Sequence, residues 1–428
     1  MGWSWLRPRA RRSSTAWHDE VNIASPAFKA SPFPFYARLR AESPVCRQRL
    51  PTGEYAWLVT RYDDAVAALK DERLVKDRRN GLTPQQAARE PWFRRAFDVL
   101  KHNMLDRDPP DHTRLRALVQ RAFTPRLVEQ ARPRIEALTA ELLDAALKRV
   151  VSGGGLRGLD IIRDYALPLP TTIIAEMLGV PAADRGYFNR WSNALLAAAA
   201  SSWRMLYAVP NALLMIRYIR GIIRRRRQQP QNDLISDLIR AEETGDKLND
   251  NELLAMVFLL LVAGHETTVN LIASGVLALL EHPEQCERLR SEPALMKPAI
   301  EELLRYTSPA EMATLRYARE DVAIGGATIP QGDMIFPVIL SANRDERQFP
   351  DPDALDITRE PNRHLSFGLG THFCLGASLA RLEGQIAIGT LLARVPHLRL
   401  AHPPSRLRWR RGMIVRGLES LPVELSPP

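Results

Sequence analysis

The stretch FGLGTHFCLG, Phe367–Gly376, decides the fold of this 428-residue chain. Cys374 lies among three glycines, with Phe367 seven residues before it and His372 two residues before it. An apolar helical pattern, LGASLARLEGQIAIGTLL, begins directly behind the cysteine. Glycines let a backbone pack flat against a large group, and the amide dipoles of a helix N-terminus favour an ionised thiolate. The stretch therefore predicts a sulfur that is held still, deprotonated and presented to a metal.

Two other interpretations of Cys374 compete with this one. An isolated cysteine is most often a buried structural residue, and His372 together with Cys374 could be half of a zinc site. However, the CxxC pair or second cysteine that zinc sites normally contain is missing here. The full decapeptide favours a metal-bound thiolate over both alternatives.

The decapeptide resembles the haem-binding signature of the cytochrome P-450 family, the haem-thiolate monooxygenases. This resemblance implies that Cys374 is the axial iron ligand and favours O–O cleavage by pushing electron density onto the iron. It implies that Phe367, Gly368 and Gly376 contact haem b. It also implies a mainly α cytochrome P-450 fold, with a large helical domain and a small strand-rich region. The haem would be buried between a distal helix that carries AGHETT and the proximal helix after Cys374.

Composition limits the domain organisation and the location of the protein. The chain is 45% hydrophobic and has only three cysteines, which predicts no disulfide framework and a reducing, cytoplasmic location. The longest apolar stretch, Leu253–Gly264, is too short to span a bilayer. We expect residues 1–20 to form a disordered basic tail without a membrane anchor, and residues 21–428 to form a single catalytic domain. The net charge of +10 comes without a nucleic-acid-binding motif, so it suits an acidic electron donor better than nucleic acid.

Hydrophobic periodicity predicts a mostly helical chain. Helices are expected over residues 32–42, 63–71, 112–123, 125–150, 166–181, 183–200, 205–227, 232–245 and 251–281. Alternating patterns predict strands over residues 54–62, 314–319, 322–329 and 334–339. The long irregular stretch over residues 343–361 leads into the cysteine loop, and such loops are normally functional.

AGHETT, Ala263–Thr268, is a polar interruption in an apolar helix. On its own it could be a polar packing network. The Thr267 hydroxyl can bond to the carbonyl of Ala263 and bend the helix, which would open a groove where dioxygen could sit over a flat cofactor. Ala263 and Gly264 are therefore predicted to contact the cofactor. Splitting dioxygen requires protons in a dry site, which an acid–alcohol pair can relay, so Glu266 and Thr267 are the predicted catalytic residues. His265 is expected to face core or solvent rather than a metal.

EELLR places Glu302 and Arg305 on one helix face. Such pairs are common and mostly exposed. In the family, an E-x-x-R pair is buried and supports the haem pocket, so the resemblance implies a structural role here. The family often has a further arginine in a DPDRF-like sequence, but this chain has Ala354 at that position. Arg359 is the candidate replacement.

Four basic residues match the positions at which the family neutralises the haem propionates. They are His112, Arg116, Arg316 and His372, and charge-assisted bonds from such groups suit carboxylates. Any one of them alone would pass as a surface cation. Arg114, which lies between the first two, is expected to face solvent.

By resemblance, the substrate chamber is formed by residues 78–100, 195–205, 260–263 and 310–315. The candidate lining residues are Leu260, Ala263, Met312 and Ala313, which suit an apolar guest. Glu311 is expected either to contact a polar group of the substrate or to point into water.

Together these features predict an enzyme that uses O2 to hydroxylate or epoxidise an apolar small molecule. With no fused flavin or iron–sulfur domain, it would receive electrons from NAD(P)H through a ferredoxin reductase and a ferredoxin. A peroxide-driven peroxygenase is one alternative, and a non-catalytic haem or ligand-binding protein is another. The Glu266–Thr267 pair disfavours both.

Overall fold

A computed structural model of the chain describes residues 17–18, 20–88, 99–152, 158–184, 186–187, 191, 202–241 and 248–425. The longer helices are α2 (Phe33–Glu42), α3 (Tyr62–Lys70), α6 (Asp111–Ala122), α7 (Pro125–Ser152), α8 (Pro168–Met177), α10 (Ser202–Gln228), α11 (Leu234–Ala241), α12 (Asp250–Glu281), α13 (Pro283–Ser291), α14 (Met296–Thr307) and α16 (Ala377–Arg394). Short helices are α1 (Pro26–Ala30), α4 (Arg78–Gly81), α5 (Pro84–Ala88) and α15 (Ile339–Ala342), and a π-helical turn spans Ile162–Ala166.

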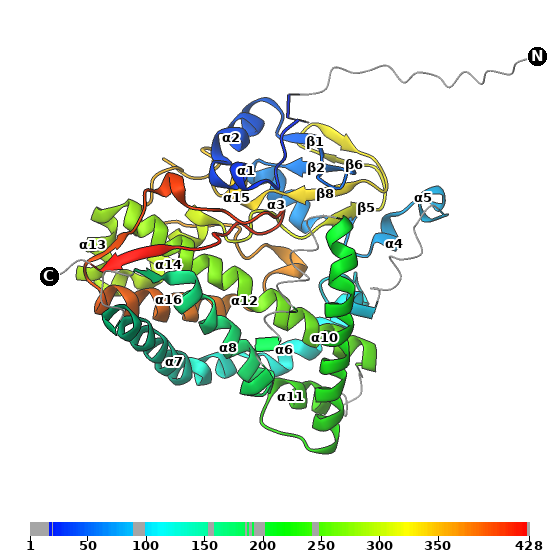
Figure 1. The fold of residues 1–428 in the computed structure, drawn as a ribbon. Coiled ribbons are helices and arrows are strands. Elements are labelled where there is room, and N and C mark those ends of the chain that lie inside the picture. Colours follow the sequence, from blue (N-terminus) through cyan, green and yellow to red (C-terminus); the bar gives the residue numbers. More distant parts are fainter. Residues whose placement is uncertain are drawn as a thin grey trace, which may run out of the picture.

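Most of the strands form a small region beside this helical body (Figure 1). They are β1 (Val45–Arg49), β2 (Tyr55–Val59), β3 (Leu74–Val75), β4 (Leu159–Asp160), β5 (Arg316–Ala318), β6 (Val322–Ile324), β7 (Ala327–Ile329), β8 (Met334–Pro337), β9 (Leu398–Leu400) and β10 (Pro422–Leu425). Five of them form a sheet in the order β1-β2-β8-β5-β3, in which only β2 and β8 are parallel. A second sheet has the order β4-β10-β9, and β6 pairs with β7. The predicted mainly α fold with a small strand-rich part is confirmed.

Helix α12 is the centre of the molecule (Figure 1). A capping box starts it, because the Asn249 side chain accepts from the amide of Glu252 and the Glu252 side chain accepts from the amide of Asn249. The helix packs against α8, α10, α14 and α16. Within the described ranges it is the one helix whose length and composition would allow it to cross a membrane, but most of its apolar window is buried inside the protein. Its burial identifies it as a core helix.

Most predicted elements are present, with local differences. The predicted helix over 251–281 is confirmed to within one residue, whereas the predicted strand over 322–329 is two strands joined by a turn at Gly325 and Gly326. Strand β1 was not predicted. The predicted helix over 183–200 lies almost entirely outside the described residues.

The N-terminal boundary differs from the prediction. Residues 1–16 lie outside the described part of the chain. Trp17 stacks on the guanidinium of Arg38 at 3.9 Å and meets the ring of Phe35, and His18 is buried. The packed part of the chain therefore begins before residue 20.

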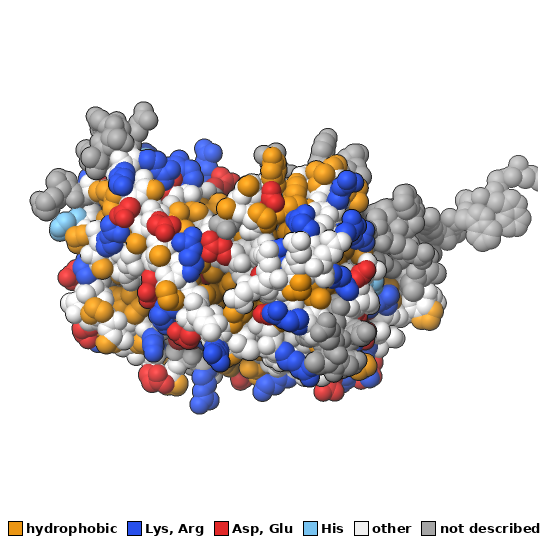
Figure 2. Space-filling view, turned by 90° about the horizontal axis from the view of Figure 1, so that it is seen from below, with side chains coloured by type: hydrophobic (Ala, Val, Ile, Leu, Met, Phe, Trp, Pro, Cys, Tyr) orange, Lys and Arg blue, Asp and Glu red, His pale blue; other side chains and the backbone are white. Residues whose placement is uncertain are grey.

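On the face drawn in Figure 2, basic side chains are interspersed with acidic and apolar ones.

Candidate active site

The loop that carries Cys374 is shaped by its backbone. Gly368 and Gly370 have φ angles of +70° and +74°, which side chains other than glycine rarely adopt. The amide of Cys374 donates to the carbonyl of Phe367 at 2.8 Å and closes the loop. These turns place the sulfur directly before α16, which begins at Ala377.

Arg381 on α16 connects this loop to α14. Its guanidinium lies 4.5 Å from the centre of the Phe367 ring and forms two hydrogen bonds to the carboxylate of Glu301, at 2.7 and 2.8 Å. His364 adds a contact of 3.1 Å to Glu301. The sequence interpretation missed these residues, because Glu301 lies 80 residues before Arg381 in the chain and no local pattern joins them.

The surroundings of Cys374 act on the pKa of its thiol in opposite directions. Burial raises the pKa of its thiol, although the amide of Gly376 and the charges of Arg116 and Arg381 lower it. A bound cation deprotonates a coordinating thiol outright, so the charge needed for a thiolate comes with the metal. Although the surrounding protein atoms raise the pKa of the thiol, the residue remains exposed, so a ligand can approach it.

The middle of α12 presents an accessible strip within an otherwise buried helix. Ala263 is exposed and Gly264 and Thr267 are partly exposed, whereas Leu260 and the residues that follow Thr267 are buried. The Thr267 hydroxyl donates to the carbonyl of Ala263 at 3.2 Å, as predicted. The helix nevertheless continues without interruption from Asp250 to Glu281. The groove expected from helix opening is replaced by a strip of small side chains.

Glu266 and Thr267 face different surroundings. Neighbouring residues on a helix do not point the same way, and no hydrogen bond joins this pair in the described structure. Instead, Oε1 of Glu266 accepts from Nη1 of Arg410 at 3.2 Å. His265 is also buried, and its Nδ1 donates to the carbonyl of Leu261 at 2.8 Å, in line with the expected core-facing role.

The four predicted propionate partners form one basic cluster. The rings of His112 and His372 lie 4.3 Å apart between centroids. Burial and then the charges of Lys76, His112, Arg316 and Arg116 lower the pKa of His372 to about 2. Both ring nitrogens of His112 are buried without a hydrogen-bond partner among the described residues. Lys76 was not predicted, since no spacing pattern marks it.

These features fit a haem. Burial lowers the pKa of Arg316 to about 10, because this guanidinium is almost fully enclosed. It donates to the carbonyl of Thr314 at 3.1 Å. Mutually repelling cations and unpaired donors call for an anion with several oxygen atoms, which the propionates of haem b would supply. The accessible Cys374 and the strip of small residues on α12 suit the two faces of a flat ring.

The E-x-x-R pair is buried and is the centre of a network. Arg305 forms two bonds of 2.7 Å to Glu302, and both side chains are fully buried. Arg305 also donates to the carbonyls of Asn343, Pro352 and Ala354. Arg359 donates to Oε1 of Glu302 at 3.2 Å, so an arginine from the stretch after Ala354 does join this pair.

Three expectations about individual side chains are wrong or need revision. Arg114 does not face solvent but forms an ion pair with Glu252. Glu311 contacts neither water nor an open chamber, because it is fully buried and accepts from Lys29 at 2.5 Å and from Tyr36 at 2.6 Å. Met312 is 1% exposed and packs in a cluster of buried side chains that includes Tyr36 and Phe336, so its side chain lies in the core.

Ala313 and Leu260, the other candidate lining residues, are partly buried and buried, respectively. Residues 89–98 and 192–201, which contain part of the predicted chamber segment 78–100 and most of the segment 195–205, lie outside the described residues. The chamber prediction therefore stays a prediction.

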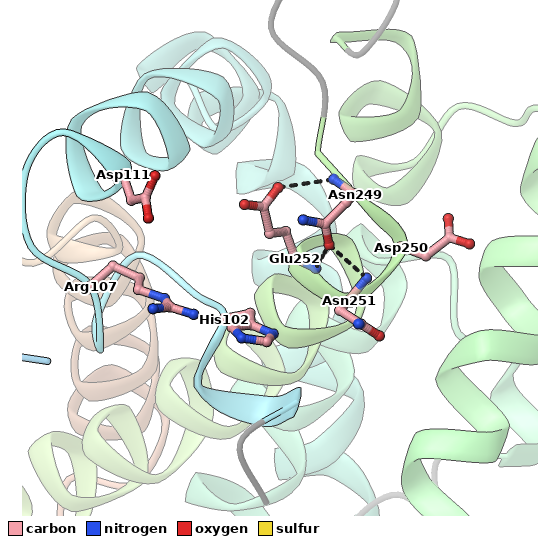
Figure 3. Close-up of a pocket in the computed structure, with 7 residues that line it drawn as sticks. All are labelled: His102, Arg107, Asp111, Asn249, Asp250, Asn251 and Glu252. Carbon is pink, nitrogen blue, oxygen red and sulfur yellow. Dashed lines mark hydrogen bonds between the residues drawn. The ribbon is translucent and has the colours of Figure 1, made fainter. Parts of the chain in front are cut away.

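A polar pocket of 410 Å³ lies at the start of α12 (Figure 3). Its lining residues are His102, Arg107, Asp111, Asn249, Asp250, Asn251 and Glu252. Thr267 lies fifteen residues after Glu252 of the pocket. At the rise of an α-helix this spacing corresponds to about 22 Å along α12. The pocket is therefore separate from the site at Cys374.

Comparisons with known proteins agree with this geometry. The family model of cytochrome P450 matches residues 53–407. The chain is 46% identical over 403 residues to the polyketide biosynthesis cytochrome P450 PksS of Bacillus subtilis, covering 93% of this chain and 97% of that protein. It is 42% identical over 391 residues to the mycinamicin IV hydroxylase/epoxidase of Micromonospora griseorubida, covering 91% and 94%. The structure of the myxobacterial cytochrome P450 CYP267B1 in complex with myristic acid superimposes with a TM-score of 0.88 at 45% identity, covering 95% and 99%.

The chain therefore belongs to the cytochrome P450 family. It is a haem-thiolate monooxygenase of the oxidoreductase class and binds haem b.

Proposed function

We propose that this cytochrome P450 hydroxylates or epoxidises an apolar small molecule of the polyketide type, using O2 and electrons from NAD(P)H. The observation that carries the proposal is the accessible strip of Ala263, Gly264 and Thr267 in an otherwise buried apolar helix. Such a strip leaves room for an apolar guest beside a hydroxyl group. The relatives named for polyketide biosynthesis and for mycinamicin IV support the substrate class.

Haem b, when bound, supplies the oxygen activation and the transfer of one oxygen atom to the substrate. Cys374 holds the iron from the loop before α16. His112, Arg116, Arg316 and His372 neutralise the propionates, and Gly368 and Gly376 allow the backbone to approach the ring. The Thr267 hydroxyl holds a proton at the accessible strip of α12, and Glu266 replenishes it. The apolar side chain of Leu260 keeps water out.

We also propose that the packed part of the chain, from Trp17 onward, acts as one catalytic domain in the cytoplasm, with a separate ferredoxin and ferredoxin reductase as electron donors. The net charge of +10 supports an acidic protein partner.

The test has two parts. The holoenzyme is titrated with a macrolide aglycone, a C14 fatty acid and a steroid, and a shift of the haem from low to high spin reports binding. Turnover is then compared with ferredoxin, its reductase and NADPH, and with hydrogen peroxide alone. We expect the macrolide to bind most tightly and to be oxidised only in the NADPH-driven reaction. Turnover driven by peroxide alone would indicate a peroxygenase, and binding without turnover would indicate a ligand-binding protein.

A further inference from the structure

A hairpin near the C-terminus holds Arg410 in a fixed position. Trp409 and Leu418 form an antiparallel bridge. The amide of Arg410 donates to the carbonyl of Gly417, and its Nε donates to the carbonyl of Leu418, both at 2.8 Å. These two hydrogen bonds to the other arm of the hairpin orient the guanidinium of Arg410. Its Nη1 atom is left to contact Glu266.

This hairpin lies directly on the face of α12 that carries Glu266. Asn270 is one helical turn beyond Glu266, on the same face. A Cβ atom built on Gly417 would lie only 2.0 Å from Oδ1 of Asn270, so the backbone of the hairpin touches the helix there. The hairpin, rather than the accessible strip at Thr267, is therefore the surface that Glu266 faces.

The carboxylate of Glu266 is incompletely paired. Its Oε1 has a single contact with Arg410, whereas Oε2 is buried without a partner in the described structure. Paired arginine–carboxylate contacts are often bidentate and strong, so a single bond of 3.2 Å leaves the carboxylate free to exchange partners. The side chain of Arg410 is 30% exposed and that of Glu266 is 11% exposed. The ion pair thus connects solvent to a buried acid.

We propose that Arg410 is the positioning residue for Glu266, and that it holds the carboxylate on the solvent side of α12, where the carboxylate takes up a proton. In the first step, a proton passes from solvent to the carboxylate of Glu266. The neutral carboxyl group then no longer forms an ion pair with Arg410. In the second step, the neutral carboxyl group turns and gives its proton to a water molecule or hydroxyl group on the Thr267 side, and the carboxylate returns to Arg410. Arg410 stays protonated throughout, so one proton is moved and no other bond is made or broken.

The charges around Glu266 set the sign of its pH dependence. Burial raises the pKa of Glu266, while the charge of Arg410 and its hydrogen bond lower it. The other titratable group beside this pair is His265, whose pKa is lowered by burial and by Arg410. Loss of Arg410 therefore removes the basic group that, among the described residues, favours ionised Glu266, and the pKa of Glu266 should rise further.

The experiment uses the holoenzyme with Arg410→Met and Arg410→Lys, and Arg411→Gln as the matched control, since Arg411 is an exposed arginine of the same hairpin. An infrared pH titration follows the protonated carboxyl band that Glu266→Gln removes. We expect the midpoint of this band to rise by about one pH unit or more in Arg410→Met, by less in Arg410→Lys, and not at all in Arg411→Gln.

A second measurement is the ratio of product to NADPH consumed. We expect about a tenfold loss in Arg410→Met, partial recovery in Arg410→Lys, and no further loss when Arg410→Met is added to Glu266→Gln. An unshifted infrared midpoint, or an equal additional loss in the Glu266→Gln background, would overturn the proposal. The coupling measurement rests on the proposed function, but the infrared titration does not, so the two can fail separately.

Discussion

Replacing Glu383 by glutamine should remove a large pH dependence of stability. Glu383 lies on α16, is 1% exposed, and neither of its carboxylate oxygens has a partner in the described structure. Burial alone raises its pKa from 4.5 to about 8. The folded state therefore holds a proton that the unfolded state has lost between these pH values. Stability falls as the pH rises through this window.

The magnitude follows from the size of the shift. One pKa unit corresponds to about 1.36 kcal/mol, so the whole window corresponds to about 5 kcal/mol, and the interval from pH 5 to pH 7.5 to about 3 kcal/mol. Glutamine has a similar shape and no charge at either pH. The difference in unfolding free energy between Glu383→Gln and the unaltered protein should therefore shift by about 3 kcal/mol in favour of the variant over this interval.

The assay is urea unfolding of the holoenzyme at pH 5, 6, 7 and 7.5, followed by tryptophan fluorescence. Glu72→Gln is the control, because Glu72 is exposed, and its difference from the unaltered protein should stay constant. Parallel stability curves for Glu383→Gln and the unaltered protein would refute the reasoning, because they would mean that Glu383 titrates at the same pH in the folded and unfolded states.

Other predictions concern the reaction and the loop support. Thr267→Ala removes the hydroxyl on the accessible strip and should divert most electrons to hydrogen peroxide, measured as peroxide formed per NADPH; unchanged coupling would contradict the proton role. Arg359→Ala removes a charge-assisted bond to buried Glu302 and should lower the unfolding free energy by about 1.5–3 kcal/mol and speed haem loss to apomyoglobin. The exposed Arg363→Ala is its control, and equal effects of the two substitutions would argue against the network.

Features set by local sequence could be predicted well. The apolar run of α12 with its starting cap determined the helix to within one residue. The Thr267 bond to Ala263 also followed, because it joins residues one turn apart. By contrast, β1 has the sequence VCRQR, in which charged and polar residues hide the alternation, and it is stabilised by its pairing with β2.

Features set by distant partners could not be predicted. Glu311 is paired with Lys29 and Tyr36, which lie 282 and 275 residues away in the chain. Arg410 reaches Glu266 across 144 residues. Nothing local to either acid indicates its partner, and the same holds for Lys76 in the basic cluster. The resemblance located four members of this cluster because it compares positions in a fold rather than neighbours in a sequence; their role toward the propionates stays a prediction.

The central claim is that Cys374 ligates the haem iron as a thiolate. The most direct test is the absorption spectrum of the reduced, CO-bound holoenzyme, with and without Cys374→Ser, at matched haem content. The unaltered protein should show the band typical of thiolate-ligated haem, and Cys374→Ser should lose it. Retention of that band in Cys374→Ser would contradict the assignment of the ligand.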